Sequence, residues 1–242
     1  MEPTLVLGIE TATFCGSVAL LCTDRLVASR TLNSRVTHSA RLLGAIEDLL
    51  AETDTRPQDL AGLAVSIGPG SFTGVRIGLS AAKGLSLALD TAIVGVSTLE
   101  ALAVRAGRDR RLICPVIDAR RKETFVAGYR WPAGAELPQL AIGCGVMPIG
   151  DFLRRLRGRC LFLGDGALRY RREIEDRLGE RASFAPPHRM LPSAEEVAWL
   201  GQRRLARGES DELARLEPVY IRPSDARLPA PKGRGKRLEA SG

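Results

Sequence analysis

The sequence predicts an α/β fold of two similar halves, each with the element order β-β-β-α-β-α. Short runs rich in Val, Ile and Leu alternate with longer segments of helical periodicity, which is typical of sheets covered by helices. The same series of elements occurs twice along the chain, which indicates a duplication. The length of 242 residues, with 45% hydrophobic and 26% charged residues, suits one large domain or two small ones.

The first half begins with three strands at hairpin spacing and continues with helices separated by single strands. Apolar residues at helical spacing predict a first helix over residues 37–51, with Thr37 as its N-cap. A second helix, over residues 73–89, is almost wholly apolar. Ser97 and Glu100 have the spacing of a capping box, which predicts a third helix that ends near Ala106. The predicted strands cover residues 5–9, 16–21, 26–32, 63–67 and 93–96.

The second half repeats this order. We expect strands over residues 112–117, 124–130, 140–146 and 160–163, and helices over residues 151–156 and 167–178. Ser193 and Glu196 form a second predicted capping box, at the start of a last long helix. The charged stretch 105–111 favours a boundary between the halves. The predicted domains are therefore residues 1–106 and 107–224, followed by a disordered basic tail over residues 225–242.

A glycine-rich turn, Gly68-Pro69-Gly70-Ser71, joins an apolar strand to the apolar helix 73–89. Ser71 can cap that helix by accepting an N–H two or three residues further on. The free N–H groups at such a helix start can bind a phosphate, which makes Gly68 and Gly70 weak candidates for cofactor binding. A tight turn with close helix packing explains the same residues without any ligand.

Composition sets the expected environment. No apolar window is long enough to span a membrane and no signal peptide is visible, so we expect a cytoplasmic protein without a membrane partner. The five cysteines contain no Cys-x-x-Cys pair and mostly lie in apolar runs, which favours reduced core residues over zinc ligands. They are Cys15, Cys22, Cys114, Cys144 and Cys160.

Seven short segments, in a fixed order, connect the chain to a known family. They are Gly8-Ile9-Glu10-Thr11, His38-Ser39, the Gly68 to Gly78 motif, the Gly95 to Leu102 segment, Ile117 to Arg121, Gly164-Asp165-Gly166 and Pro218 to Arg222. Over residues 4–225 the chain resembles the bacterial TsaB (YeaZ) family of tRNA threonylcarbamoyladenosine biosynthesis proteins. That family belongs to the actin/sugar-kinase/Hsp70 superfamily, whose members bind ATP between two lobes. The resemblance implies two tandem RNase H-like lobes with mixed sheets.

The resemblance also implies a function. TsaB looks like a paralogue of TsaD, which transfers a threonylcarbamoyl group to tRNA and holds a metal in a His-x-x-x-His site. Those two histidines align with Thr98 and Leu102, and Leu102 cannot ligate a metal. We therefore expect no metal, no cofactor and no catalysis. The expected role is a scaffold that binds and activates a TsaD homologue and helps recruit the TsaE ATPase. It would form a homodimer when TsaD is absent and contact tRNA only through the complex.

The superfamily's nucleotide cleft is altered in this sequence. Glu10 replaces the Asp that organises Mg²⁺ in superfamily ATPases. Gly164 and Gly166 could form a second phosphate loop, but they suit an ordinary β-to-α turn better. The cluster 118–123 could bind an anion or form a solvated hairpin. The alternative function is an active nucleotide-binding phosphotransferase.

The helix over residues 73–89 points to a partner surface, because its apolar residues occupy most of its circumference. Gly74, Gly78 and Ala82 recur every four residues, a spacing that lets another helix approach closely, although burial inside the same lobe explains it too. In the TsaB family this helix and the preceding one contact TsaD. The candidate interface residues are Leu42, Ile46, Phe72, Gly74, Val75, Gly78, Leu79, Ala82 and Leu85.

The formal net charge of +7 is concentrated at the C-terminus. Five basic residues from Arg227 onward are opposed only by Glu239, so over half of the excess lies there. A third possibility is therefore a tRNA-binding subunit that holds RNA with this tail. The usual RNA-binding surface of interleaved aromatic and basic residues is not evident in the sequence.

Overall fold

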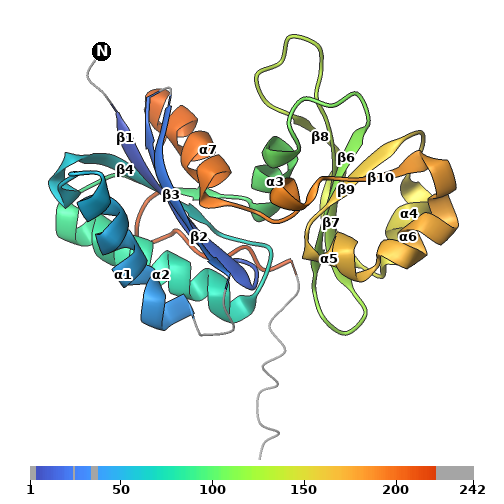
Figure 1. Cartoon of the computed structure of the whole chain (residues 1–242), viewed down its shortest axis with the longest axis horizontal. Helices are drawn as coiled ribbons and strands as arrows, with labels where there is room; N and C mark the ends of the chain where they lie inside the picture. Colours follow the sequence, from blue (N-terminus) through green and yellow to red (C-terminus); the bar gives the residue numbers. More distant parts are fainter. Residues whose placement is uncertain (1–3, 24, 34–37, 222–242) are drawn as a thin grey trace, which may run out of the picture.

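The computed structural model describes residues 4–23, 25–33 and 38–221. The predicted cap Thr37 and the predicted tail 225–242 lie outside the described residues. Two lobes lie side by side along the long axis of the molecule, and each is built around one sheet (Figure 1).

Each lobe contains a mixed sheet of five strands, and the two sheets share one topology. The strand orders are β3-β2-β1-β4-β5 and β8-β7-β6-β9-β10, with the first three strands antiparallel and the others parallel. This repetition confirms the two tandem RNase H-like lobes. The strands are β1 (Leu5–Glu10), β2 (Cys15–Cys22), β3 (Arg25–Asn33), β4 (Leu60–Ser66), β5 (Ile93–Val96), β6 (Leu112–Asp118), β7 (Thr124–Arg130), β8 (Gln139–Met147), β9 (Cys160–Leu163) and β10 (Ala182–Phe184).

The helices follow the strands in the predicted order. They are α1 (His38–Glu52), α2 (Phe72–Leu89), α3 (Thr98–Ala106), α4 (Ile149–Arg155), α5 (Asp165–Arg169), α6 (Arg171–Leu178) and α7 (Ala194–Ala206), with short 3₁₀ turns at Pro57–Asp59, Gly179–Arg181 and Pro187–Arg189.

Several local predictions fail. The predicted helix 167–178 is two helices that meet at Tyr170, and the short strand β10 was not expected. The Ser97 capping box is absent, because the Ser97 hydroxyl interacts with Tyr129 and makes no bond to the start of α3. Ser193 caps α7, since its hydroxyl accepts the N–H of Glu195 at 3.4 Å, but the predicted box with Glu196 does not form, and the Glu196 carboxylate pairs with Arg105 instead.

The two lobes exchange a helix. Helix α3 belongs to the first half of the chain, yet Leu99 and Leu102 pack against β6 and β7 of the second sheet. Helix α7 belongs to the second half and covers β1 and β4 of the first sheet, as Figure 1 shows. It lies so close that a methyl group on Gly8 would collide with the carbonyl of Ala194. The predicted boundary after residue 106 thus separates α3 from the sheet that it covers.

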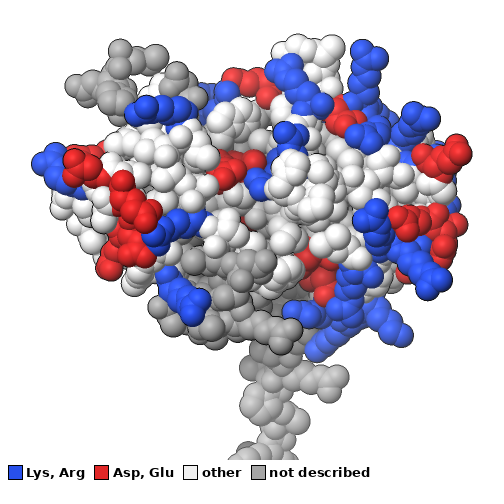
Figure 2. Space-filling model, in the orientation of Figure 1, with Lys and Arg blue, Asp and Glu red and all other residues white. Residues whose placement is uncertain are grey.

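Charged side chains cover both lobes, and basic ones gather along the lower edge of the second lobe (Figure 2). The hairpin between β6 and β7 projects at this edge (Figure 1). Cysteines follow the prediction in part. Cys15, Cys114 and Cys160 are buried thiols, Cys22 is partly buried and Cys144 is exposed on β8.

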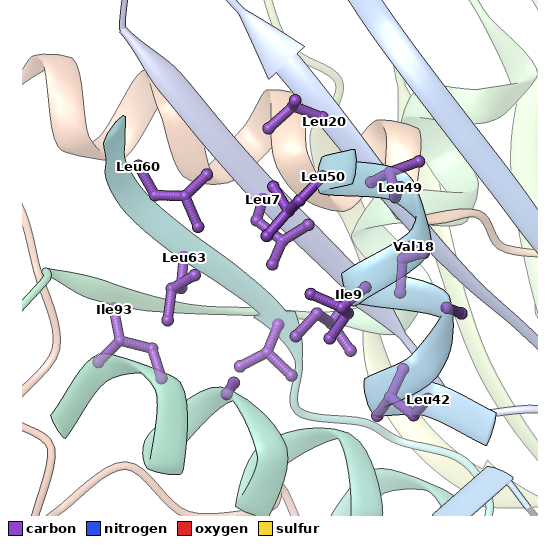
Figure 3. Packing of buried hydrophobic residues seen from close by; sticks show 14 of the residues in the cluster. Leu7, Ile9, Val18, Leu20, Leu42, Leu49, Leu50, Leu60, Leu63 and Ile93 are labelled. Carbon is purple, nitrogen blue, oxygen red and sulfur yellow. The ribbon is translucent and has the colours of Figure 1, made fainter. Parts of the chain in front are cut away.

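The core of the first lobe fills the space between its sheet and helices α1 and α2. Leu7 and Ile9 project from β1 toward α1, which carries Leu42 and Leu49, whereas Leu63 of β4 lies beside Ile93 (Figure 3). On the opposite face of the same sheet, α7 supplies Val197 and Leu200. Helices therefore cover both faces of the first sheet. This packing holds in place the ends of β1 and β4, from which the turns at the lobe boundary begin.

Candidate functional site

The glycine-rich turn after β4 is held tightly from two sides. Ser71 caps α2 as predicted, since its hydroxyl accepts the N–H of Gly74 at 3.2 Å. The Ser71 N–H donates to the carbonyl of Ala12 at 2.6 Å, and the Gly68 carbonyl accepts the N–H of Thr98. A side chain on Gly70 would collide with Ala12. Gly70 and Gly74 therefore allow close packing against the turn after β1, and Gly68 supplies a positive φ angle of 98°.

Glu10 ends β1 and is fully buried. Its Oε1 accepts the N–H of Ala12 at 2.5 Å, so the carboxyl group turns back onto its own chain. Its Oε2 has no hydrogen-bond partner among the described residues. Burial raises the pKa of Glu10 to about 7, although bonds from Ala12 and Ser66 act in the opposite direction. Glu10 is therefore a half-satisfied core carboxyl group.

The turn Gly164-Asp165-Gly166 joins β9 to α5 and fastens it to β6. Asp165 Oδ1 accepts the N–H of Asp118 at 3.0 Å, and the Gly164 N–H donates to the carbonyl of Met190 at 2.7 Å. Burial raises the pKa of Asp165. A side chain on Gly166 would collide with the backbone of Ile117. These contacts suit the β-to-α turn that the sequence favoured.

A cleft of about 610 Å³ lies between the lobes. The turn after β1, the glycine-rich turn, the β6–β7 hairpin and Asp165 line it, together with the chain segment 218–221. That segment is bound to the first lobe, because the Val219 N–H donates to the carbonyl of Ile67 at 2.8 Å. Glu10 is not among the lining residues. The cleft therefore lies between the lobes, and the carboxyl group at the end of β1 does not line it.

An aromatic cluster stands at the mouth of the cleft. The rings of Phe72 and Tyr220 lie 5.8 Å apart between centroids. The Arg76 guanidinium lies 3.7 Å from the Phe72 centroid, and its Nε donates to the Tyr220 hydroxyl at 2.9 Å. Residues more than 140 positions apart in the chain meet here, as the separation of 144 between Arg76 and Tyr220 shows.

The expected position of the small-residue stripe on α2 is wrong. Gly74 and Gly78 face β1, where side chains on them would strike Thr11, and Ala82 is fully buried. Most other predicted interface residues are also buried in the first lobe: Leu42, Ile46, Val75 and Leu79. Leu85 is partly buried. Only Phe72 is exposed, at 50%. The stripe lets α2 pack closely on its own sheet, which is the alternative that the sequence left open.

The same two helices present a different set of residues outward. A groove of about 560 Å³ runs between α1 and α2. Leu43, which is 50% exposed, lines it with Phe72, Arg76, Ile77, Ser80 and Ala81. Sequence reasoning missed Leu43, although it is an apolar residue that lies outside the buried stripe of Leu42, Ile46 and Leu49. That α1 and α2 contact a partner protein therefore stays a prediction. The residues that would make the contact are now those that line this groove.

The positions aligned with the metal ligands of TsaD do not fit a metal. Thr98 and Leu102 are both fully buried in α3, and Leu102 packs among apolar residues of the second lobe. Within residues 4–23, 25–33 and 38–221, no group of three His, Cys, Asp or Glu side chains is placed to hold a metal ion. In the same part of the chain, no helix has the length and hydropathy needed to cross a bilayer.

Comparisons with known proteins agree on one group of relatives. Residues 27–228 match a family model described as TsaD: tRNA N6-adenosine threonylcarbamoyltransferase. The tRNA threonylcarbamoyladenosine biosynthesis protein TsaB of Bacillus subtilis is 35% identical, over 91% of this chain and 95% of that protein. The TsaB protein of Escherichia coli is 31% identical, over 90% and 94%. YeaZ from Pseudomonas aeruginosa superposes with a TM-score of 0.76 at 31% identity, covering 90% of this chain and 99% of that structure.

Proposed function

Because this chain belongs to the TsaB family of tRNA threonylcarbamoyladenosine biosynthesis proteins, we propose that it is a non-catalytic subunit that binds and activates a TsaD homologue. The biosynthetic role follows from the family. The scaffold role, and help in recruiting a TsaE ATPase, are our proposal.

The observation that carries the scaffold role is a contrast between two regions of the chain, one buried and one exposed. At the positions where a transferase paralogue binds metal, this chain has the buried residues Thr98 and Leu102. On α1 and α2 it instead presents an apolar groove that includes the half-exposed Leu43 and Phe72. Exposed apolar side chains that line a groove favour a protein contact over a solvated face.

We place the TsaD homologue in the groove between α1 and α2. Docking of a partner helix there would bury Leu43, Ile77 and Ala81, which the chain itself leaves at least partly accessible. When that partner is absent, a second copy of this chain would cover the same groove. No metal or cofactor is part of the proposal, and the expected site of action is the cytoplasm.

The test is capture of a TsaD homologue from the same source by the tagged protein. Leu43→Arg should abolish capture, because a charge would enter a desolvated contact. Leu87→Arg is the matched control, since Leu87 is 75% exposed near the end of α2 and outside the groove. Capture by the Leu43→Arg variant at wild-type strength would remove the groove from the interface.

The inter-lobe cleft of about 610 Å³ is the observation that favours the alternative, an active phosphotransferase. Its volume is in the range of small-molecule sites. Magnesium-dependent turnover of ATP by the isolated chain would support this second function.

A further inference from the structure

We propose that the mouth of the inter-lobe cleft binds unpaired nucleotides of an RNA, with bases stacked on its exposed aromatic rings and phosphates on the basic β6–β7 hairpin. The proposed function supplies only the kind of RNA, a tRNA. A direct contact between this chain and RNA goes beyond the scaffold role, in which RNA is reached through the partner.

Three aromatic rings line the cleft and remain about half exposed. Phe14, Phe72 and Tyr220 are 52%, 50% and 46% exposed. They come from the turn after β1, the start of α2 and the C-terminal segment, so no window of the sequence shows them together. Stacking of an unpaired base on such a ring contributes about 1–3 kcal/mol and tolerates any base.

Two of these rings are fixed before any ligand binds. Arg76 covers one side of the Phe72 ring and holds the Tyr220 hydroxyl by a hydrogen bond. Tyr220 is also anchored through its neighbour Val219, which pairs with Ile67. Binding to rings already held in place loses little conformational entropy. The aromatic cluster is therefore suited to stacking.

Basic side chains stand across the mouth from this cluster. Arg120 lines the cleft with its side chain 82% exposed, and Arg121 and Lys122 follow it in the hairpin, both exposed. All three have positive φ angles, of 63°, 50° and 65°. Each left-handed non-glycine residue costs about 1–2 kcal/mol, and this hairpin contains three in succession. The fold thus maintains a strained loop that carries three positive charges at the edge where basic side chains gather (Figure 2).

Three carboxylates, those of Asp118, Glu123 and Asp165, lie near these basic residues. Asp165 Oδ1 accepts the N–H of Asp118, and Asp118 Oδ1 accepts the N–H of Arg120. Asp118 Oδ2 pairs with Arg169 at 2.9 Å and lies 3.8 Å from Arg120. Asp118 therefore faces two guanidinium groups. With Arg169 included, four basic side chains outnumber the three carboxylates, which leaves a small excess of positive charge for phosphates.

The dimensions favour unpaired RNA over a duplex or a magnesium nucleotide. A cleft of about 610 Å³ can admit a base but not a double helix. Glu10 turns away from the cleft, and the oxygens of Asp118 are held by basic or backbone groups, which leaves few ligands for Mg²⁺. A strand that places bases in the cleft would extend its phosphates over the hairpin.

The test is fluorescence anisotropy with the full-length protein and two labelled probes, an unmodified tRNA transcript and a blunt RNA duplex of equal charge. We expect tighter binding of the transcript, with affinity falling steeply between 50 and 200 mM salt, on the order of the loss that several phosphate contacts give. Phe14→Ala should weaken binding about 10-fold, which corresponds to the loss of one stacked base. Arg120→Glu should weaken it by at least as much.

Matched controls separate a site from general charge. Leu87→Ala removes an exposed apolar side chain elsewhere, and Arg56→Glu reverses a charge that is 79% exposed before the amino end of β4. Both should bind the transcript as the wild type does. Equal losses in Arg56→Glu and Arg120→Glu, or unchanged binding in Phe14→Ala, would overturn the proposal. Equal affinity for the duplex would do the same.

Two further measurements separate rival explanations. If replacing Arg227, Lys232, Arg234, Lys236 and Arg237 by Ser abolishes binding while Phe14→Ala does not weaken it, the C-terminal segment holds the RNA and the cleft proposal is wrong. Capture of the TsaD homologue should be unchanged in Phe14→Ala and Arg120→Glu. If a variant loses RNA binding but still captures the TsaD homologue, the proposed function is unaffected. If the wild-type protein fails to capture the TsaD homologue, the RNA-binding result is unaffected.

Discussion

Arg105 of α3 and Glu196 of α7 form an ion pair at 2.9 Å, although each helix covers the sheet of the other half of the chain. The same guanidinium lies 3.4 Å from Glu195 and donates to the carbonyl of His188. The side chains of Arg105 and Glu196 are only 17% and 16% exposed. This contact joins the two exchanged helices at the boundary between the lobes.

Arg105→Ala should lower the free energy of unfolding by about 2–3 kcal/mol, because it leaves a largely buried carboxylate without its partner. Urea unfolding followed by circular dichroism measures the change. Arg215→Ala is the control, since its ion pair with Glu212 is largely exposed and its loss should change stability by under about 1 kcal/mol. Equal effects of the two substitutions would show that the helix junction is not held by this pair.

Glu10 should make the protein less stable as the pH rises from about 4.5 to about 7. The pKa of Glu10 is raised from 4.5 to about 7 in the folded state, so between these values the folded chain binds more protons than the unfolded chain. Its destabilising contribution is therefore absent below pH 4.5 and complete above pH 7. Glu10→Gln should increase stability at pH 8 by up to about 3 kcal/mol and change little at pH 4.5. Denaturant unfolding of both proteins across this range checks the sign, and a benefit of the substitution that grew toward acid would contradict it.

The isolated protein should not hydrolyse ATP above background. The carboxyl group at the end of the first strand is buried and bonded to its own backbone, away from the cleft. Phosphate release by highly purified protein, with and without Mg²⁺, measures this. Steady turnover that disappears in Glu10→Ala would show that the cleft is catalytic.

Ala82→Arg should prevent folding. If Ala82 instead faced a partner protein, the variant would fold and lose only the contact with that partner. Ala82 is fully buried on the inner face of α2, and an unpaired guanidinium there would cost more than about 4 kcal/mol. Leu43→Arg lies on the exposed side of α1 and should change stability by under about 0.5 kcal/mol. Thermal unfolding of both variants compares them. A folded Ala82→Arg protein would show that α2 can shift away from β1.

Patterns close together in the sequence predicted most of the fold. Apolar runs and helical spacing located nearly all elements, and the Ser71 cap was correct because it depends on residues three positions apart. The burial of Gly74 and Gly78 could not be separated from a partner contact, since both need small residues at the same spacing. The resolving fact is the presence of Thr11 next to them, which only the folded chain reveals.

The candidate site was less predictable for a related reason. Phe14, Phe72, Arg120 and Tyr220 come from four separate segments, and their meeting depends on how the lobes are placed. The predicted Ser97 cap is also absent, and Ser97 contacts Tyr129 of the second sheet. The spacing of residues in the sequence can predict hydrogen bonds between near neighbours. It does not predict which of two neighbouring lobes a helix such as α3 or α7 will cover.

The helix exchange has a consequence for synthesis on the ribosome. All five strands of the first sheet are complete at Val96, but the helix that covers one face of that sheet ends at Ala206. At about 5–20 residues per second, the nascent chain exposes Val6, Ala64 and Val94 for roughly 5–20 seconds before α7 emerges. Premature release anywhere in that interval leaves an apolar sheet face open. Such fragments are expected to aggregate or to be held by chaperones, so production of this protein depends on translation continuing through α7.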